Sequence, residues 1–323
     1  PYIRGLVGPR NLLLVDGVRF NNATYRTGPN QYLSLLDPNN YRRFEVLMGP
    51  ASVQYGSDAM GGVIQAFPRR WSRDVASEGG FGLRFSSPDT ATSGWGHGAW
   101  QGERHGLLVG AVVRRFGELV AGGGVKQPIS AYQQGAWHVR GRYDLGSKTT
   151  VTATWLGARV RDAGRADRLY EGRYRFYDNE DDLAYVELRH RGTGLVRNVR
   201  VVVSAHRTSE TVERFRCGLI DPKRDVAACL EAGDVVRGPG LPGNPNPDPP
   251  GAPLTRQTRS TDTVWTAGGI AFARLALLGG RVRLGTGVEG YLDTVVDSST
   301  DERRDSSNWS WDKAARGNFS ADS

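Results

Sequence analysis

The sequence predicts a mainly β chain, in which an N-terminal α+β unit precedes part of a transmembrane antiparallel β-barrel. Three observations carry this prediction. After position 78, segments of about ten residues alternate apolar and polar side chains, as barrel strands do between lipid and water. The connections alternate between short and long, like the turns and external loops of such barrels. No run of about 18 apolar residues occurs, which excludes a helical membrane span.

The N-terminal unit begins with a predicted hairpin. Leu12 to Val15 and Val18 to Phe20 are apolar segments separated by Asp16-Gly17. Asp-Gly favours the positive φ angles that a two-residue primed turn requires. The sequence therefore predicts a tight hairpin at this point.

A second compact unit follows at residues 43–65. Arg43 to Met48 alternates like a strand, Gly49-Pro50 ends it, and Ala51 to Tyr55 is predicted to form a short helical turn. Gly56, Gly61 and Gly62 then mark the return to another strand. A phosphate-binding loop is disfavoured because no Gly-Lys-Ser/Thr follows.

These segments together resemble the plug domain of TonB-dependent outer-membrane receptors. Arg-Gly at 4–5, Val-Asp-Gly-Val-Arg at 15–19 and Tyr-Gly-Ser-Asp-Ala-x-Gly-Gly-Val-Ile at 55–64 match the usual wording of that family. The chain departs from it at Met48, where Arg or Lys is common, and at 65–68, where Asn-Ile is usual. The motif residues that carry the resemblance are Arg4, Asp16, Gly17, Arg43, Glu45, Gly49, Pro50, Tyr55, Gly56, Gly61 and Gly62.

The predicted organisation has three parts. Residues 1–68 are the C-terminal part of a plug domain, 69–78 are a linker, and 79–323 are the N-terminal part of the barrel. A plugged lumen is typical of barrels with about 22 strands. We therefore expect this chain to contain about nine of about 22 barrel strands and to be truncated at both ends. The nine predicted strands lie near 79–86, 93–102, 107–116, 133–143, 149–160, 182–190, 198–210, 262–276 and 281–297.

The alternation also predicts which side chains face the lumen. In 198–210 the valines at 199, 201 and 203 share one face, and Arg200, Ser204 and His206 share the other. The same reasoning gives Arg281, Arg283 and Glu289 as lumen-facing candidates. Arg4, Arg43 and Glu45 of the plug are candidates for ion pairs with lumen residues such as Glu289 or Arg283.

The residues give little support for catalysis or for a bound cofactor. The five His residues have none of the spacings that metal sites use, and no nucleophile is placed with a base. We therefore expect no enzyme activity, cofactor or metal site. Cys217 and Cys229 lie in the long connection 211–261, where an oxidising exterior would favour a disulfide. An unpaired or metal-binding pair is the alternative.

The resemblance implies active import across the outer membrane. The implied partner is TonB, binding a box that would precede this segment, and the implied substrates are scarce chelates such as ferric siderophores, haem or cobalamin. Residues 21–31 take the place of an apical plug loop, so the ligand-contact candidates are Asn22, Tyr25, Arg26, Asn30 and Gln31. The alternative is that these residues only cap the plug and do not contact a ligand.

The formal net charge of +8 suits an anionic chelate or the lipopolysaccharide of the surrounding outer membrane. Nucleic-acid binding is disfavoured, since no basic stripe carries stacking aromatic residues. Two other functions stay open. One is a plugged receptor whose main role is signalling or attachment, and the other is a soluble extracellular β-protein.

Overall fold

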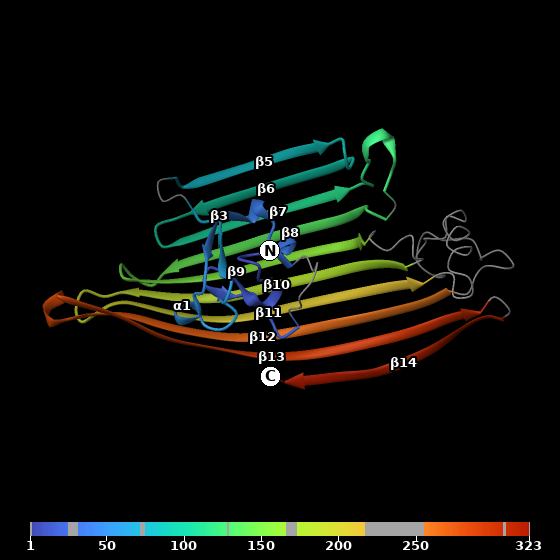
Figure 1. Ribbon diagram of the computed structural model, residues 1–323. Helices are drawn as coiled ribbons and strands as arrows, with labels where there is room; N and C mark the ends of the chain where they lie inside the picture. Colours follow the sequence, from blue (N-terminus) through green and yellow to red (C-terminus); the bar gives the residue numbers. More distant parts are fainter. Residues whose placement is uncertain are drawn as a thin grey trace.

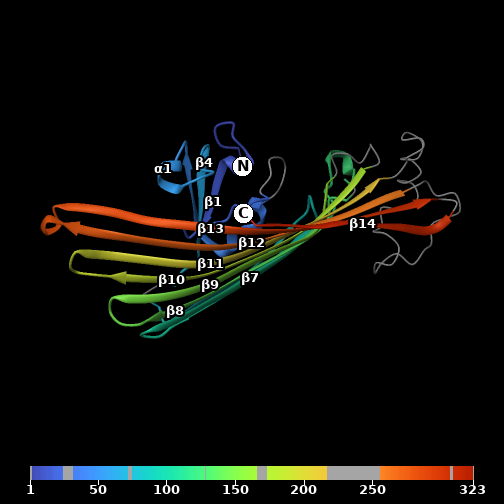
Figure 2. The same ribbon diagram turned by 90° about the horizontal axis from the view of Figure 1, so that it is seen from below.

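The computed structural model describes residues 2–24, 32–71, 75–127, 129–165, 173–216, 255–305 and 308–322. Within these ranges the strands form two separate sheets. The smaller has four strands in the order β2-β1-β4-β3, and the larger has ten consecutive strands from β5 to β14. The small sheet lies against one face of the large one (Figures 1 and 2).

The small sheet contains the hairpin and the glycine-rich unit that the sequence predicts. β1 (Asn11–Val15) pairs antiparallel with β2 (Val18–Arg19) and parallel with β4 (Gly62–Pro68). Asp16 and Gly17 have φ angles of 52° and 82°, which confirms the predicted turn. β3 (Tyr41–Met48) pairs with β4, and α1 (Ser52–Tyr55) lies between them in the chain. The short helices are η1 (Gly8–Arg10), η2 (Tyr32–Leu35) and η3 (Pro38–Asn40).

In the large sheet every strand pairs antiparallel with the next one in the chain. The strands are β5 (Ser77–Ser86), β6 (Ala91–Gln101), β7 (His105–Phe116), β8 (Tyr132–Asp144), β9 (Thr149–Gly164), β10 (Arg173–Arg191), β11 (Val196–Arg216), β12 (Thr255–Leu277), β13 (Val282–Asp305) and β14 (Asn308–Asp322). Two further short helices, η4 (Gly122–Gly124) and η6 (Leu278–Gly280), lie in connections.

The connections at the two ends of the large sheet differ in part as the sequence predicts. At one end all four are short, comprising 102–104, 145–148, 192–195 and 278–281. The other end has the long connections 117–131 and 217–254, but also the shorter 87–90, 165–172 and 306–307. The long connection predicted at 161–181 is wrong, because β9 extends to Gly164 and β10 begins at Arg173. In transmembrane barrels the short turns are periplasmic and the long loops external, so we refer to the two ends as the turn end and the loop end.

The large sheet has one strand more than the nine predicted, and several strands are longer than predicted. The tenth strand is β14, Asn308–Asp322, in a segment where no strand is predicted. In that segment charged residues occupy both odd and even positions, for example Asp312 and Lys313, so no alternation of apolar and polar residues is visible. β10 begins at Arg173, nine residues before the predicted start at 182. The prediction misses this part of the strand because Asp178 to Asp182 is polar throughout and shows no apolar face.

The two faces of the large sheet differ sharply in character. On β11, the side chain of Val203 is 64% exposed, whereas that of His206 is 2% exposed. Phe81, Trp155, Trp265 and Val288 are likewise exposed on the face away from the small sheet. We call this apolar side the outer face and the side that contacts the small sheet the inner face. The predicted segregation of residues 198–210 is thus confirmed.

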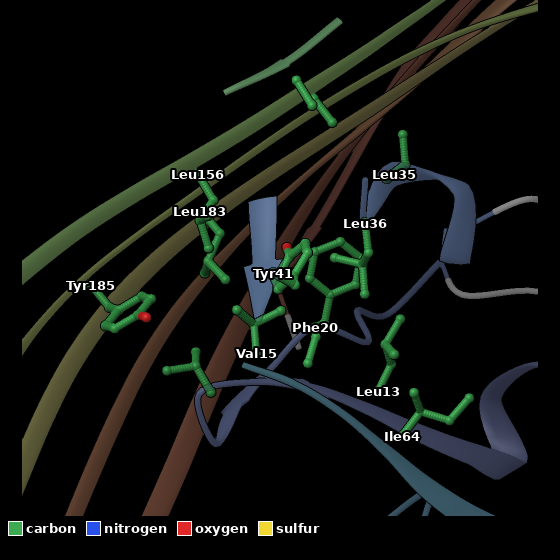
Figure 3. Close-up of a cluster of buried hydrophobic side chains, with 14 of the residues drawn as sticks. Leu13, Val15, Phe20, Leu35, Leu36, Tyr41, Ile64, Leu156, Leu183 and Tyr185 are labelled. Atoms are coloured by element: carbon green, nitrogen blue, oxygen red, sulfur yellow. The ribbon is translucent and has the colours of Figure 1, made fainter. Parts of the chain in front are cut away.

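One hydrophobic core joins the two sheets. Val15, Phe20 and Tyr41 of the N-terminal unit belong to the same buried cluster as Leu156 and Leu183 of the large sheet. Figure 3 shows these side chains pointing toward one another across the interface. Burying a large apolar side chain contributes about 1.5–3 kcal/mol, so the N-terminal unit is packed firmly on the inner face.

Candidate functional site: the anchor between the hairpin and the wall

The tip of the β1–β2 hairpin makes a buried ionic contact with the inner face. The Asp16 carboxylate oxygen Oδ2 accepts hydrogen bonds from Arg140 Nη1 on β8 and from Tyr185 Oη on β10, both at 2.9 Å. Arg70, which follows β4, donates from Nη2 to Asp16 Oδ1 at 2.9 Å. One carboxylate therefore connects the hairpin with two strands of the wall and with the segment that leads to β5.

A further arginine contacts the backbone of the same turn. Arg200 Nη2 on β11 donates to the Asp16 carbonyl oxygen at 2.6 Å, and Arg200 Nε donates to Glu187 Oε2 at 2.6 Å. A Cβ atom at Gly17 would lie 3.3 Å from Arg200 Nη1. Glycine at position 17 thus permits both the positive φ angle of the turn and the close approach of the Arg200 guanidinium, because it has no side chain. We call Asp16, Arg70, Arg140, Tyr185 and Arg200 the hairpin anchor.

The central ion pair of the hairpin anchor is shielded from water. The side chains of Asp16 and Arg140 are both 4% exposed, and their closest N···O distance is 2.9 Å. Burial alone would raise the pKa of Asp16, but the charges of Arg140 and Arg70 outweigh it and hold the pKa below its ordinary value of 3.8. Asp16 is therefore ionised at neutral pH and holds Arg140 in place.

A pH dependence follows from this lowered pKa. Because the pKa of Asp16 is lower in the folded state, its stabilising contribution is complete above pH 3.8 and is lost as the pH falls through the lowered folded-state value. We expect the hairpin to become more accessible to protease below pH 4. An Asp16→Asn variant should lose that part of the acid response. An identical acid response in both proteins would contradict the assignment.

Three further contacts connect the N-terminal unit with the wall on its loop-end side. Arg114 Nη2 of β7 donates to Asp37 Oδ1 at 3.0 Å, and the Asp37 side chain is almost fully buried. His138 Nδ1 lies 2.9 Å from Asn40 Oδ1. Gln134 Nε2 donates to the Ser34 carbonyl oxygen at 2.8 Å. These contacts place η2 and η3 against β7 and β8.

The contact between Phe20 and His206 adds an aromatic element to the interface. The two ring centroids are 4.8 Å apart, and His206 Nε2 lies 2.7 Å from Asp181 Oδ2. The imidazole is thus held by β10 while it packs on the hairpin. No group of three or more His, Cys, Asp or Glu side chains able to hold a metal ion occurs among the residues that the structure describes.

The structure distributes the predicted site residues over several places. Arg43 and Glu45 are exposed and hydrogen-bonded to each other at 2.7 Å. Arg4 approaches Gly49, whose Cβ would lie 3.7 Å from Arg4 Nη1. On β13, Glu289 Oε1 lies 3.0 Å from where a Cβ at Gly56 would be. Arg283 shares the inner face with Glu289, and Arg281 directly precedes that strand.

The predicted ligand contacts are described only in part. Asn22 is buried, and its Oδ1 accepts hydrogen bonds from Thr24 N and Thr24 Oγ1, both at 3.1 Å. Tyr25, Arg26, Asn30 and Gln31 lie outside the described residues, as do Cys217 and Cys229. Asn22 thus supports the local turn that leads into this segment.

Sequence reasoning identified Asp16 as a turn residue but missed its partners. Arg140 and Arg200 lie in segments whose side chains alternate between apolar and polar, and both are on the polar side. This pattern predicts that they face the lumen. The alternation does not tell which inner residue meets which plug residue, because that depends on where the plug lies against the wall.

Within the described ranges, no helix combines the length and the apolar character that crossing a membrane would need. The large sheet is open and antiparallel and has one apolar face, and an α+β domain covers its polar face. This arrangement defines part of an outer-membrane barrel with an internal plug.

Comparisons with known proteins agree with this class. Residues 1–63 match the family described as TonB-dependent Receptor Plug Domain. The vitamin B12 transporter BtuB of Vibrio vulnificus is 32% identical over 94 residues, which are 29% of this chain and 14% of that protein. The iron-regulated outer membrane virulence protein of Vibrio cholerae is 41% identical over 81 residues, which are 23% of this chain and 12% of that protein.

Two solved structures share the fold. The copper transporter OprC has a TM-score of 0.66 at 17% identity, over 96% of this chain and 42% of that chain. The FrpB iron transporter from Neisseria meningitidis has a TM-score of 0.51 at 11% identity, over 91% of this chain and 56% of that chain. The chain therefore spans a small part of the curated relatives and about half or less of these structures. Residues 1–63 thus form a TonB-dependent receptor plug domain, and the sheet that this domain covers has the fold of the wall in the two transporters.

Proposed function

We propose that the protein imports a scarce chelate of the ferric siderophore, haem or cobalamin class through energy-coupled movement of the plug. The observation that carries this proposal is the hairpin anchor, where a buried ion pair and two further hydrogen bonds attach the plug to three strands of the wall. A plug held in this way blocks the inner face, so a substrate passes only after the contacts change. The names of three similar proteins, which mention vitamin B12 and iron, support this range of substrates, whereas the name of OprC adds copper.

The proposal includes three further parts. The protein is a transport protein and not an enzyme, and its energy comes from TonB bound at a box that precedes the plug. Residues 1–68 act as the plug, 69–78 as the linker and 79–323 as wall and loops. Outer-membrane lipid and lipopolysaccharide contact the apolar outer face, where Phe81 and Val288 are exposed.

TonB dependence is the direct test of this function. We expect cells that contain the full-length receptor and TonB to accumulate one member of a panel of labelled chelates. In cells without TonB, binding of that chelate should persist while uptake falls to background. Equal uptake with and without TonB would contradict energy-coupled plug movement.

The apical segment makes a separate prediction. Tyr25→Ala combined with Arg26→Ala should weaken binding of the transported chelate at least about tenfold, since the two changes remove an aromatic surface and a charge-assisted donor. Thermal unfolding of the variant should be unchanged, which separates loss of a ligand contact from loss of folding. Unaltered affinity would remove these residues from the ligand site.

A further inference from the structure

A cavity of about 360 Å³ lies between the plug and the wall. Arg42, Arg69 and Arg70 line it from the plug side, together with Trp71. Glu78 of β5 and His97 of β6 line it from the wall side. None of these residues was singled out by the motifs of the sequence.

The charges around the cavity are unbalanced. Three guanidinium groups face one carboxylate, and His97 adds a group that carries positive charge when protonated. Arg69 Nε donates to the Asn39 carbonyl oxygen at 2.7 Å, and Arg70 bonds Asp16 through Nη2. A guanidinium has five N–H donors, so each of these arginines has further donors besides the one in this bond. The Arg70 side chain is 40% exposed, which leaves it accessible to a solute in the cavity.

The cavity lies near the turn end of the wall and beside the hairpin anchor. Glu78 and His97 lie in the halves of β5 and β6 that are nearer to the turn end, where Glu78 pairs with Ala99. Arg70 lines the cavity and also belongs to the hairpin anchor. A solute that crosses from the loop end would therefore meet these arginines beside the contact that holds the plug.

We propose that this cavity is a binding site for the carboxylate or phosphate group of an anionic solute, and that the imported chelate carries such a group. The second part rests on the proposed function, whereas the anion site itself does not. Guanidinium groups bind carboxylate and phosphate oxygens through paired hydrogen bonds, and the small size of the cavity admits part of a chelate at a time. An anion bound to Arg70 shares that guanidinium with Asp16, which couples occupancy to the hairpin anchor.

The anion site is testable without knowing the chelate. In a full-length receptor whose cysteines, Cys217 and Cys229 among them, are all replaced by Ser, a single thiol is introduced as His97→Cys, and in a second variant as Glu78→Cys. The rates of modification by a sulfonate-bearing and a trimethylammonium-bearing methanethiosulfonate reagent are compared. We expect the anionic reagent to react about tenfold faster at both positions, since charged clefts concentrate opposite charge by at least this factor.

Two further arms make the result specific. Inorganic phosphate should slow the anionic reagent, and Arg42→Gln should lower the ratio of the two rates. Arg115→Gln, an equal charge change on the outer face of β7, should leave the ratio unchanged. Equal rates for both reagents, no effect of phosphate, or equal effects of Arg42→Gln and Arg115→Gln would overturn the anion site. A receptor that shows the rate ratio but no TonB-dependent uptake would instead contradict the proposed function.

Discussion

Replacing Asp16 by Asn is expected to release the plug hairpin from the wall. The amide keeps the shape of the side chain but removes the charge that pairs with Arg140 and Arg70. Breaking a buried ion pair by removing one partner costs about 3–5 kcal/mol, because the other charge is left buried without compensation. We expect the free energy of plug unfolding, measured in urea by protease cleavage of the hairpin, to fall by about this amount.

A matched change tests whether the effect belongs to the hairpin anchor. Asp58 pairs with Arg19 in the same plug at 2.5 Å, but both side chains are about one quarter exposed. Asp58→Asn should therefore cost about 1 kcal/mol or less. Adding Arg140→Met to Asp16→Asn should recover part of the loss, because the unpaired buried charge is then removed. Equal effects of the two Asp variants, or no recovery with Arg140→Met, would show that the ion pair does not hold the plug.

Gly62→Ala is expected to have the second-largest effect. A Cβ atom at this position would overlap the Leu47 carbonyl oxygen on β3 and would lie 3.0 Å from Ile3 Cγ2. The obstacle is backbone in a paired strand, where Met48 and Gly62 are opposite each other, so it cannot move aside like a flexible side chain. Overpacking of this kind costs about 1–3 kcal/mol, and urea unfolding of the plug should show the loss.

The control for this variant is Gly98→Ala on β6. A Cβ at Gly98 would meet no atom within 4 Å, so the stability of the receptor should change by about 0.5 kcal/mol or less. If Gly62→Ala were as mild as Gly98→Ala, close packing would not explain the glycine at position 62.

The local elements of the plug could be predicted from the sequence because their causes are local. Asp16-Gly17 specifies a primed turn through its own φ angles, and Gly49-Pro50 ends β3 without help from distant residues. The wall strands could be predicted where lipid imposes an apolar face. Beyond the apolar part of the wall, strands such as β10 continue with polar residues on both faces, and there the alternation fails.

The hairpin anchor could be predicted only in part. Asp16 is separated from Arg140 by 124 positions and from Tyr185 by 169. The alternation places both partners on the inner face, but several other polar residues share that face with them. Which of them meets Asp16 is decided by packing of the plug core on Leu156 and Leu183, a tertiary property without a local signal.

A reversible tether between the hairpin and the wall tests the central claim most directly. Arg19 N on β2 donates to Tyr291 Oη on β13 at 3.3 Å, so thiols introduced as Arg19→Cys and Tyr291→Cys are within reach of a short bifunctional thiol reagent. Cys217 and Cys229 are replaced by Ser, and the untethered double variant serves as the reference. We predict that the tethered receptor still binds its chelate but imports none, and that reduction restores import. Import at the reference rate while the tether is intact would contradict a plug that must leave the wall for transport.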